Sequence, residues 1–352
     1  MHLKLGLEAL ANMKTALPCA LLALFSHFAQ AEWIFLPSNV NTNISFRAVH
    51  AVSANVVWVG GSGGTVLLTV DGGQTWEKRP VPDAANLDFR GIAAVDAQTA
   101  VVMSAGEAEK GQTRIYRTTD GGKQWQLVFQ TGEKGVFLDG VAFWDNRNGL
   151  VLGDPVDGKW YLLKTSDGGQ TWQRLSPDKL PRMLPDEAAF AASNTSLLLQ
   201  GKSKVWIGSG GAARARVFSS PDRGQTWHVA DTPIHSGESS GIFGLRFLDS
   251  RHGIAIGGDH KKEREPCRNV IVTADGGRTW QSATSTDPPG LKESVVILPR
   301  NNLLAVGPSG TCLSKDFGKS WLKIDLSPFH AASSVAGHCW AVGGKGVIAK
   351  WE

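Results

Sequence analysis

Seven residues at equivalent positions of a repeating pattern include six ionisable side chains, which together could bind a charged partner. The guanidinium groups of Arg47 and Arg90 match a carboxylate in geometry, because each presents a planar fork of donors. Asp139, Glu187 and Glu293 could supply acid/base chemistry if two of them lay within reach of one substrate. The alternative is a solvated surface on which these charges pair with one another. We call the set the ring residues: Arg47, Arg90, Asp139, Glu187, Phe243, Glu293 and His330.

The elements that must position the ring residues follow from a motif that occurs six times. Its pattern is Ser/Thr-x-Asp-x-Gly-x-x-Trp, and we call each copy an Asp turn. At a hairpin tip, the Asp carboxylate can accept backbone N–H groups of its own turn, and Gly adopts conformations closed to other residues. We therefore predict that these carboxylates form turns and have no catalytic role: Asp71, Asp120, Asp167, Asp222, Asp275 and Asp316.

Each Asp turn joins the third and fourth of four short predicted strands. Units of four strands that repeat every 40 to 50 residues are typical of the blades of a β-propeller. The last unit lacks a fourth strand, and residues 32–35 (EWIF) resemble that strand in the other units. We therefore predict an all-β fold over residues 32–352. It is a seven-bladed β-propeller of four-stranded antiparallel blades, closed by the mature N-terminus, which supplies the outer strand of the last blade.

This architecture predicts where the ring residues lie. In a propeller, the connections into the first strand of each blade and those between its second and third strands share one face. The ring residues precede or begin the first strands, so we expect them around the mouth of the central channel. Two charged loops should lie on the same face, residues 106–112 and residues 258–269 (GDHKKEREPCRN). Long charged loops on a rigid scaffold are common binding elements, although a solvated excursion explains them equally well.

The N-terminus has the pattern of a secretory signal peptide over residues 1–31. Lys14 is followed by an apolar run and by the small-x-small sequence Ala29-Gln30-Ala31. Met13 is an alternative start. The run is too short for a transmembrane helix, and no later stretch is long and apolar enough. We expect an exported protein, periplasmic or secreted, with no transmembrane segment in the mature chain.

Composition and cysteine usage limit the remaining classes. The net charge of +4 is too small to indicate a nucleic-acid-binding protein. No cysteine or histidine spacing indicates a metal site, and we predict no cofactor. Cys312 and Cys339 fall in neighbouring repeats and could form a disulfide in an oxidising compartment, which would leave Cys267 as the third thiol of the mature chain. The alternative is three unpaired thiols.

The Asp turns resemble the Asp-box, or bacterial neuraminidase repeat. The whole mature chain resembles the photosystem II stability/assembly factor family. That resemblance implies a non-enzymatic scaffold that binds a protein or peptide partner in the cell envelope, and we expect it to be a monomer. Sialidases also carry Asp-boxes, so a glycan-binding or glycoside-hydrolase propeller remains an alternative. The tyrosine nucleophile that sialidases use has no good candidate here, because Tyr116 and Tyr161 both lie in predicted third strands.

Overall fold

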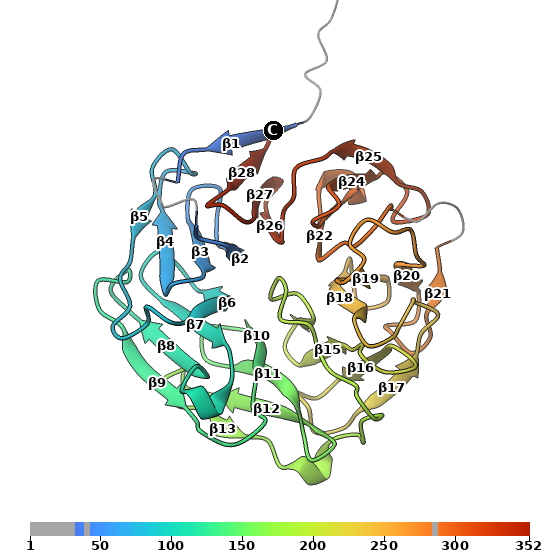
Figure 1. The fold of residues 1–352 in the computed structure, drawn as a ribbon, viewed down its shortest axis with the longest axis horizontal. Coiled ribbons are helices and arrows are strands. Elements are labelled where there is room, and N and C mark those ends of the chain that lie inside the picture. The colour runs from blue at the N-terminus through green and yellow to red at the C-terminus, as the bar shows by residue number, and fades with distance from the viewer. Residues whose placement is uncertain (1–31, 39–42, 284–287) are drawn as a thin grey trace, which may run out of the picture. The chain divides into compact units, whose positions relative to one another are not determined.

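Seven four-stranded sheets follow one another around a central axis in the computed structural model (Figure 1). The structure describes residues 32–38, 43–283 and 288–352. All pairings between neighbouring strands in these sheets are antiparallel, and the only helices among the described residues are three short 3-10 turns. The predicted seven-bladed β-propeller is confirmed. The predicted signal peptide, residues 1–31, lies outside the described residues.

The blades are numbered from the first complete sheet in the chain, and each runs from its innermost to its outermost strand. The strands of blades one to three are β2 (Phe46–Ala51), β3 (Val57–Gly61), β4 (Thr65–Thr69) and β5 (Glu77–Lys78); β6 (Asp88–Ala94), β7 (Ala100–Ala105), β8 (Arg114–Thr118) and β9 (Gln126–Gln130); β10 (Leu138–Phe143), β11 (Gly149–Val156), β12 (Lys159–Thr165) and β13 (Gln173–Arg174).

The remaining blades follow the same order around the axis. The strands of blades four to seven are β14 (Leu197–Gln200), β15 (Lys204–Gly208), β16 (Arg216–Ser220) and β17 (His228–Asp231); β18 (Ser240–Phe247), β19 (Gly253–Asp259), β20 (Val270–Thr273) and β21 (Gln281–Ser282); β22 (Ser294–Ile297), β23 (Leu303–Val306), β24 (Thr311–Ser314) and β25 (Leu322–Asp325); β26 (Ala331–Val335), β27 (His338–Val342), β28 (Ile348–Trp351) and β1 (Trp33–Leu36).

The outer strand of blade seven comes from the beginning of the described chain. Strand β1 pairs with β28, with Trp33 opposite Trp351, and the C-terminus lies beside β1 in Figure 1. The backbone N–H of Glu32 donates to the carbonyl of Glu352 over 2.8 Å, and the reverse bond measures 3.1 Å. Both ends of the described chain are therefore held in one sheet.

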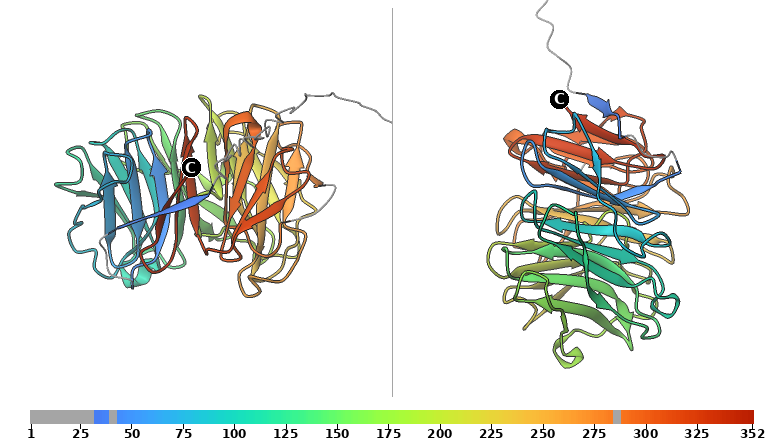
Figure 2. Two further views of the ribbon diagram at one scale, coloured as in Figure 1. Left: turned by 90° about the horizontal axis from the view of Figure 1, so that it is seen from above. Right: turned by 90° about the vertical axis from the view of Figure 1, so that its left-hand side faces the viewer.

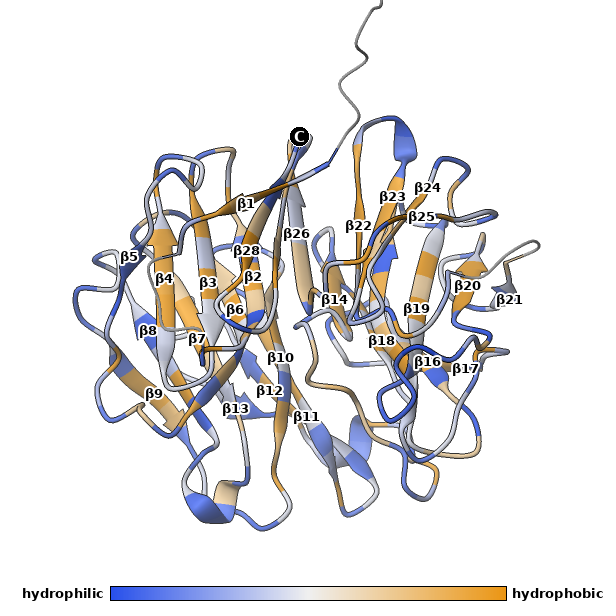
Figure 3. Ribbon diagram, turned by 45° about the horizontal axis from the view of Figure 1, so that its top comes forward, coloured by the Kyte–Doolittle hydropathy of each residue, from blue (hydrophilic) through white to orange (hydrophobic). Residues whose placement is uncertain are grey.

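Large aromatic side chains fill the space between neighbouring blades. Figure 2 shows the sheets standing next to one another with strands running between the two faces, and Figure 3 shows apolar residues along strands such as β4 and β18. Trp58 of blade one is fully buried and contacts Trp125, the last residue of an Asp turn in blade two, edge to face at 6.1 Å. Such a buried Trp stabilises the fold by about 3–5 kcal/mol relative to Ala, so each blade depends on its neighbour.

The carboxylates of the Asp turns bond within their own turns. Asp71 accepts the backbone N–H of Thr75 at 2.9 Å and its hydroxyl at 2.6 Å, and Thr69 donates to the same carboxylate at 2.8 Å. These bonds, led by the Thr75 hydroxyl, lower the pKa of Asp71 to about 2. Arg223 and Phe317, which replace a glycine of the pattern, adopt the left-handed region with φ of 60° and 55°. The turn geometry therefore persists where the sequence departs from the motif.

Of the two alternatives for Cys312 and Cys339, the structure has them unpaired. The structure has Cys312 and Cys339 as free, buried thiols, on the third strand of blade six and the second strand of blade seven. Cys339 packs among apolar residues such as Leu304 and Val306, which raises the pKa of its thiol. Positions in neighbouring repeats place two cysteines in adjacent blades, but they do not bring the two sulfur atoms within bonding distance.

None of the helices among residues 32–38, 43–283 and 288–352 has the length and hydrophobicity that crossing a bilayer would require.

Candidate functional site

A β-bulge positions the ring residue in four of the seven blades. The pairing between first and second strands shifts by one residue at Arg47, Arg90, Asp139 and Phe243. A bulge leaves its extra residue unpaired and redirects the side chain, and bulges are common next to binding sites. The structure therefore gives these four residues one equivalent place, at the end of the channel opposite the Asp turns. We call this the ring end and the opposite one the Asp-turn end.

Blades one, six and seven form one charged cluster at the ring end. Glu293 and His330 stand directly before β22 and β26, and the His330 Nδ1 atom lies 2.7 Å from the Glu293 carboxylate. The Arg47 guanidinium lies 3.8 Å from the other oxygen of Glu293, which is too long for a strong hydrogen bond. The Arg47 side chain is 24% exposed. Its charge is thus only loosely paired and is accessible to a partner.

Blades two and three form a second cluster with buried acids. Arg90 donates to the carboxylate of Asp88 at 2.7 Å and to the carbonyl of Ala191 at 3.2 Å, so its donors are more fully used than those of Arg47. Asp139 is 1% exposed, and one of its carboxylate oxygens has no partner. Burial and the nearby Asp154 raise the pKa of Asp139 well above its usual value. Burial raises that of Asp154 to about 6. Burial and the neighbouring carboxylate therefore both disfavour the charged form of Asp139.

Glu187 does not join the ring. Its buried carboxylate is bound by two guanidinium nitrogens of Arg216 and by the hydroxyl of Ser209, at 2.6 Å for the latter. The first strand of blade four begins only at Leu197, so Ser196 is the residue that precedes it. The prediction that Glu187 precedes or begins this strand therefore placed the start of blade four nine positions too early. Glu187 acts as the structural partner of Arg216.

The displaced start of blade four reflects a segment that crosses the channel. Residues 188–196, the cross-channel segment, contact four other blades. The Asn194 side chain accepts the N–H of Val141 at 2.8 Å and donates to the carbonyls of Val141 at 3.1 Å and Ile92 at 3.2 Å. Ser193 donates to the carbonyl of Glu293 on blade six at 2.7 Å.

Asn194 thus completes the inner edges of β6 and β10 as an additional strand would. Gly91 and Gly140 permit this approach, because a Cβ at either position would lie 3.1 or 3.4 Å from the Asn194 oxygen. The sequence contained one signal of this segment. The spacing between Trp172 and Trp227 is 55 residues, the longest between successive Asp-turn tryptophans.

Aromatic side chains complete the ring end on blades four and five. Phe190 of the cross-channel segment stacks on the ring residue Phe243, with centroids 4.1 Å apart and planes at 4°. His260, in the charged loop of residues 258–269, lies with its ring 5.9 Å from Phe190. The loop's charges pair locally, for example Lys261 with Glu238 at 2.5 Å. This end of the channel therefore has a half-buried, loosely paired cation on one side and the half-buried ring of Phe190 on the other.

The arrangement suits binding better than acid/base chemistry. Asp139 is buried, Glu187 is paired with Arg216, and Glu293 is held by His330, so the three carboxyl groups occupy separate environments. Tyr116 and Tyr161 lie in the third strands β8 and β12, away from the ring end. In the described part of the chain, no group of three or more His, Cys, Asp or Glu side chains could hold a metal ion.

Comparison with known proteins identifies relatives of the same architecture. No protein-family model matches the chain. The photosystem II assembly lipoprotein Ycf48 of Picosynechococcus sp. is 26% identical over 306 residues, which cover 74% of this chain and 80% of the relative. A solved structure of YCF48 bound to D1 peptide superposes with a TM-score of 0.60, at 19% identity, over 91% of this chain and 94% of that one.

Two further solved structures show how widely the fold is shared. YCF48 from Cyanidioschyzon merolae has a TM-score of 0.64 at 18% identity, covering 91% of this chain and 98% of that one. The WD40 propeller domain of Doa1 has a TM-score of 0.60 at only 12% identity, covering 92% and 97%. The fold alone therefore does not select a function. The sequence relationship is more specific: the chain is homologous to the photosystem II assembly factor Ycf48 and shares a seven-bladed propeller with it.

Proposed function

We propose that this protein is an exported, non-enzymatic propeller scaffold that binds a protein or peptide partner in the cell envelope through the ring end of its channel. The homologous Ycf48 is named an assembly lipoprotein, which is compatible with export. A solved YCF48 structure carries a D1 peptide, which supports a peptide as the kind of partner. The client of this chain is a separate question from the client of Ycf48.

The loose pairing of Arg47 carries the proposal. A guanidinium 3.8 Å from its nearest carboxylate and 24% exposed can exchange that contact for a closer bond to an acidic side chain of a partner. Phe190, which is half-buried and stacks on the buried ring of Phe243, offers an apolar contact at the same end of the channel. A peptide with an acidic residue and an apolar or aromatic residue therefore fits the ring end best.

Partner capture by variants tests this assignment. The wild-type protein, Arg47→Ala and Lys78→Ala would be immobilised and exposed to solubilised cell envelope, and bound proteins would be quantified by mass spectrometry. Lys78 is an exposed cation on the outer strand β5, so it controls for nonspecific charge. We expect Arg47→Ala to lose a discrete partner by about tenfold or more, and Lys78→Ala to keep it.

Two outcomes would contradict the proposal. Equal capture by wild type and Arg47→Ala, with unchanged thermal melts, would remove the ring end as the binding surface. Strong signals on a glycan array, or turnover of a fluorogenic sialoside, would favour the glycan-directed alternative. Arg47→Ala and Arg90→Ala combined would remove both cations, although Arg90 also holds Ala191 and its loss should affect stability.

A further inference from the structure

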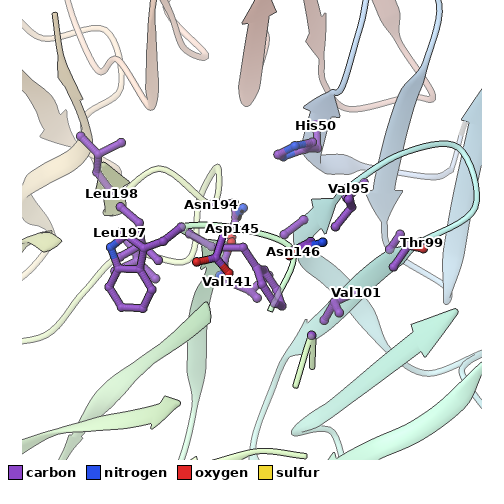
Figure 4. A pocket seen from close by; sticks show the side chains of 18 of the residues that line it. His50, Val95, Thr99, Val101, Val141, Asp145, Asn146, Asn194, Leu197 and Leu198 are labelled. Atoms are coloured by element: carbon purple, nitrogen blue, oxygen red, sulfur yellow. Dashed lines mark hydrogen bonds between the residues drawn. The ribbon is translucent and has the colours of Figure 1, made fainter. Parts of the chain in front are cut away.

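A cavity of about 420 Å³ lies at the other end of the channel, where the first strands of blades two and three finish next to the Asp turns (Figure 4). Its walls are mostly apolar and come from several blades, including Ala93, Val95, Val141 and Leu198. A few polar groups converge on it. The cavity has the size and composition of small-molecule sites, which are apolar hollows with a small number of polar anchors. Its polar lining includes His50, Thr99, Asp145, Asn146, Asn194 and Arg246.

Arg246 is the unusual member of this lining. It lies near the end of β18, after a run of apolar residues and glycine, and its guanidinium donates to the carbonyl of the neighbouring Leu245 at 3.0 Å. Within the described residues no carboxylate forms an ion pair with it. Burial lowers the pKa of Arg246 to about 10, so the guanidinium is disfavoured there but still charged at neutral pH. A partly buried charge without a counter-ion is costly unless a ligand supplies one.

The other ionisable groups of the cavity do not supply that counter-ion. Asp145 lines the cavity, but both oxygens of its carboxylate accept hydrogen bonds from the side-chain amide of Asn148, at 2.9 and 3.0 Å. The same carboxylate lies 3.5 Å from the guanidinium of Arg223. Burial and then the charge of Arg246 lower the pKa of His50 to about 4, so its imidazole is neutral at pH 7. With Asp145 matched by Arg223, the cavity carries one uncompensated positive charge, on Arg246.

We propose that this cavity binds a small molecule with one carboxylate and an apolar body, with Arg246 as the anchor for the carboxylate. A monoanion balances the single charge, whereas a phosphate dianion would bring a second negative charge into an apolar hollow beside Asp145. The guanidinium fork binds a carboxylate through two parallel hydrogen bonds. The neutral His50 ring adds a donor or acceptor, and the apolar walls bury the body of the ligand. The site lies at the opposite end of the channel from the ring residues and does not depend on the proposed partner binding.

Titration calorimetry with benzoate tests the proposal on the full-length protein. Benzamide has the same shape without the charge. We expect benzoate to bind wild type and benzamide to bind at least about tenfold more weakly, a difference of about 1.4 kcal/mol. Arg246→Met should also weaken benzoate about tenfold or more. The matched control is Arg251→Met, since Arg251 is an exposed arginine of the same blade and the same end that does not line the cavity.

A second readout keeps the test valid if Arg246→Met fails to fold. A bound carboxylate next to Arg246 should raise the pKa of His50 in the wild-type protein, as measured by NMR titration of its ring, because it offsets the positive charge that helps to lower it. Benzamide should leave the pKa of His50 where it is. The proposal is overturned if benzoate and benzamide bind alike, if Arg246→Met keeps the affinity of wild type, or if benzoate leaves the His50 titration unchanged.

A further binding comparison with peptides distinguishes peptide C-termini from free small acids as the source of the carboxylate. A tripeptide with a C-terminal Phe would be compared as the free acid and as the amide. Tighter binding of the free acid than of benzoate would assign the anchor to peptide C-termini, and weaker binding would assign it to free small acids. Either result requires that the amide lose affinity, and equal binding of acid and amide would count against the role of Arg246.

Discussion

Replacing Asn194 by Ala tests whether the cross-channel segment stabilises the propeller. The change removes three hydrogen bonds between its side chain and the backbone of Val141 and Ile92. At about 1 kcal/mol for each net bond, the loss is about 3 kcal/mol. Asn194 also has φ of 64°, a left-handed conformation that Asn tolerates better than Ala by about 1 kcal/mol. We therefore expect Asn194→Ala to lower the free energy of unfolding by about 4 kcal/mol.

Asn301→Ala is the matched control, because it separates the hydrogen bonds from the backbone strain. Asn301 has φ of 60°, is exposed, and its side chain forms no hydrogen bond within the described residues. Its replacement should cost only the strain, about 1 kcal/mol. Equilibrium urea denaturation followed by tryptophan fluorescence measures both variants against wild type. If the two losses agree within about 1 kcal/mol, Asn194 does not act as a substitute strand and the reasoning fails.

Three further changes test the electrostatics of the interior. The pKa of His50 is lowered from 6.5 to about 4 in the folded protein, so the unfolded chain binds more protons between these pH values. The free energy of unfolding of wild type should therefore fall by up to about 3 kcal/mol as pH is lowered from 6.5 to 4. His50→Gln should lack this loss. Asp154 shifts in the opposite direction, with a pKa raised from 3.8 to about 6. The free energy of unfolding of wild type should therefore fall by up to about 3 kcal/mol as pH rises through that interval, and thermal melts of Asp154→Asn should lack this loss. Arg216→Met would leave Glu187 buried without its cation; a loss of about 3–5 kcal/mol in urea is expected, and wild-type stability would show that the pair is dispensable.

The blade repeat was predictable because its determinants are local. In each Asp turn, the bonding partners lie within six residues of one another, as Thr69, Asp71 and Thr75 do. Trp125 then follows at a fixed distance from its turn and contacts the neighbouring blade. Because these hydrogen bonds and contacts depend on residues close together in the chain, each structural repeat leaves the same residue pattern in the sequence. Counting it gives six of the seven blades, and the strand-like segments at the two ends of residues 32–352 give the seventh.

The ring was only partly predictable because its position depends on pairing between strands. Arg47, Arg90 and Asp139 stand near the beginning of the first strands, as predicted, and each lies at a bulge. In blade four, a segment that contacts four other blades precedes the first strand, and its anchor Asn194 has bonding partners 53 and 102 residues away. No local pattern reports such contacts. Arg246 was missed for a related reason: one arginine in an apolar strand becomes informative only when the surrounding strands leave it without a counter-ion.

The two ends of the channel should act independently, because the cross-channel segment lies between them. Asn194 lines the cavity at the Asp-turn end, whereas Ala191, three residues earlier, binds Arg90 at the ring end. Distant sites that share no contact usually respond additively to mutation. Arg246→Met should therefore leave partner capture unchanged, and Arg47→Ala should leave the affinity for benzoate within about twofold. Benzoate binding measured in Arg47→Ala, and partner capture measured in Arg246→Met, check this. If either substitution altered function at the far end, the segment would have to transmit a change, and Asn194→Ala would then be expected to uncouple the two sites.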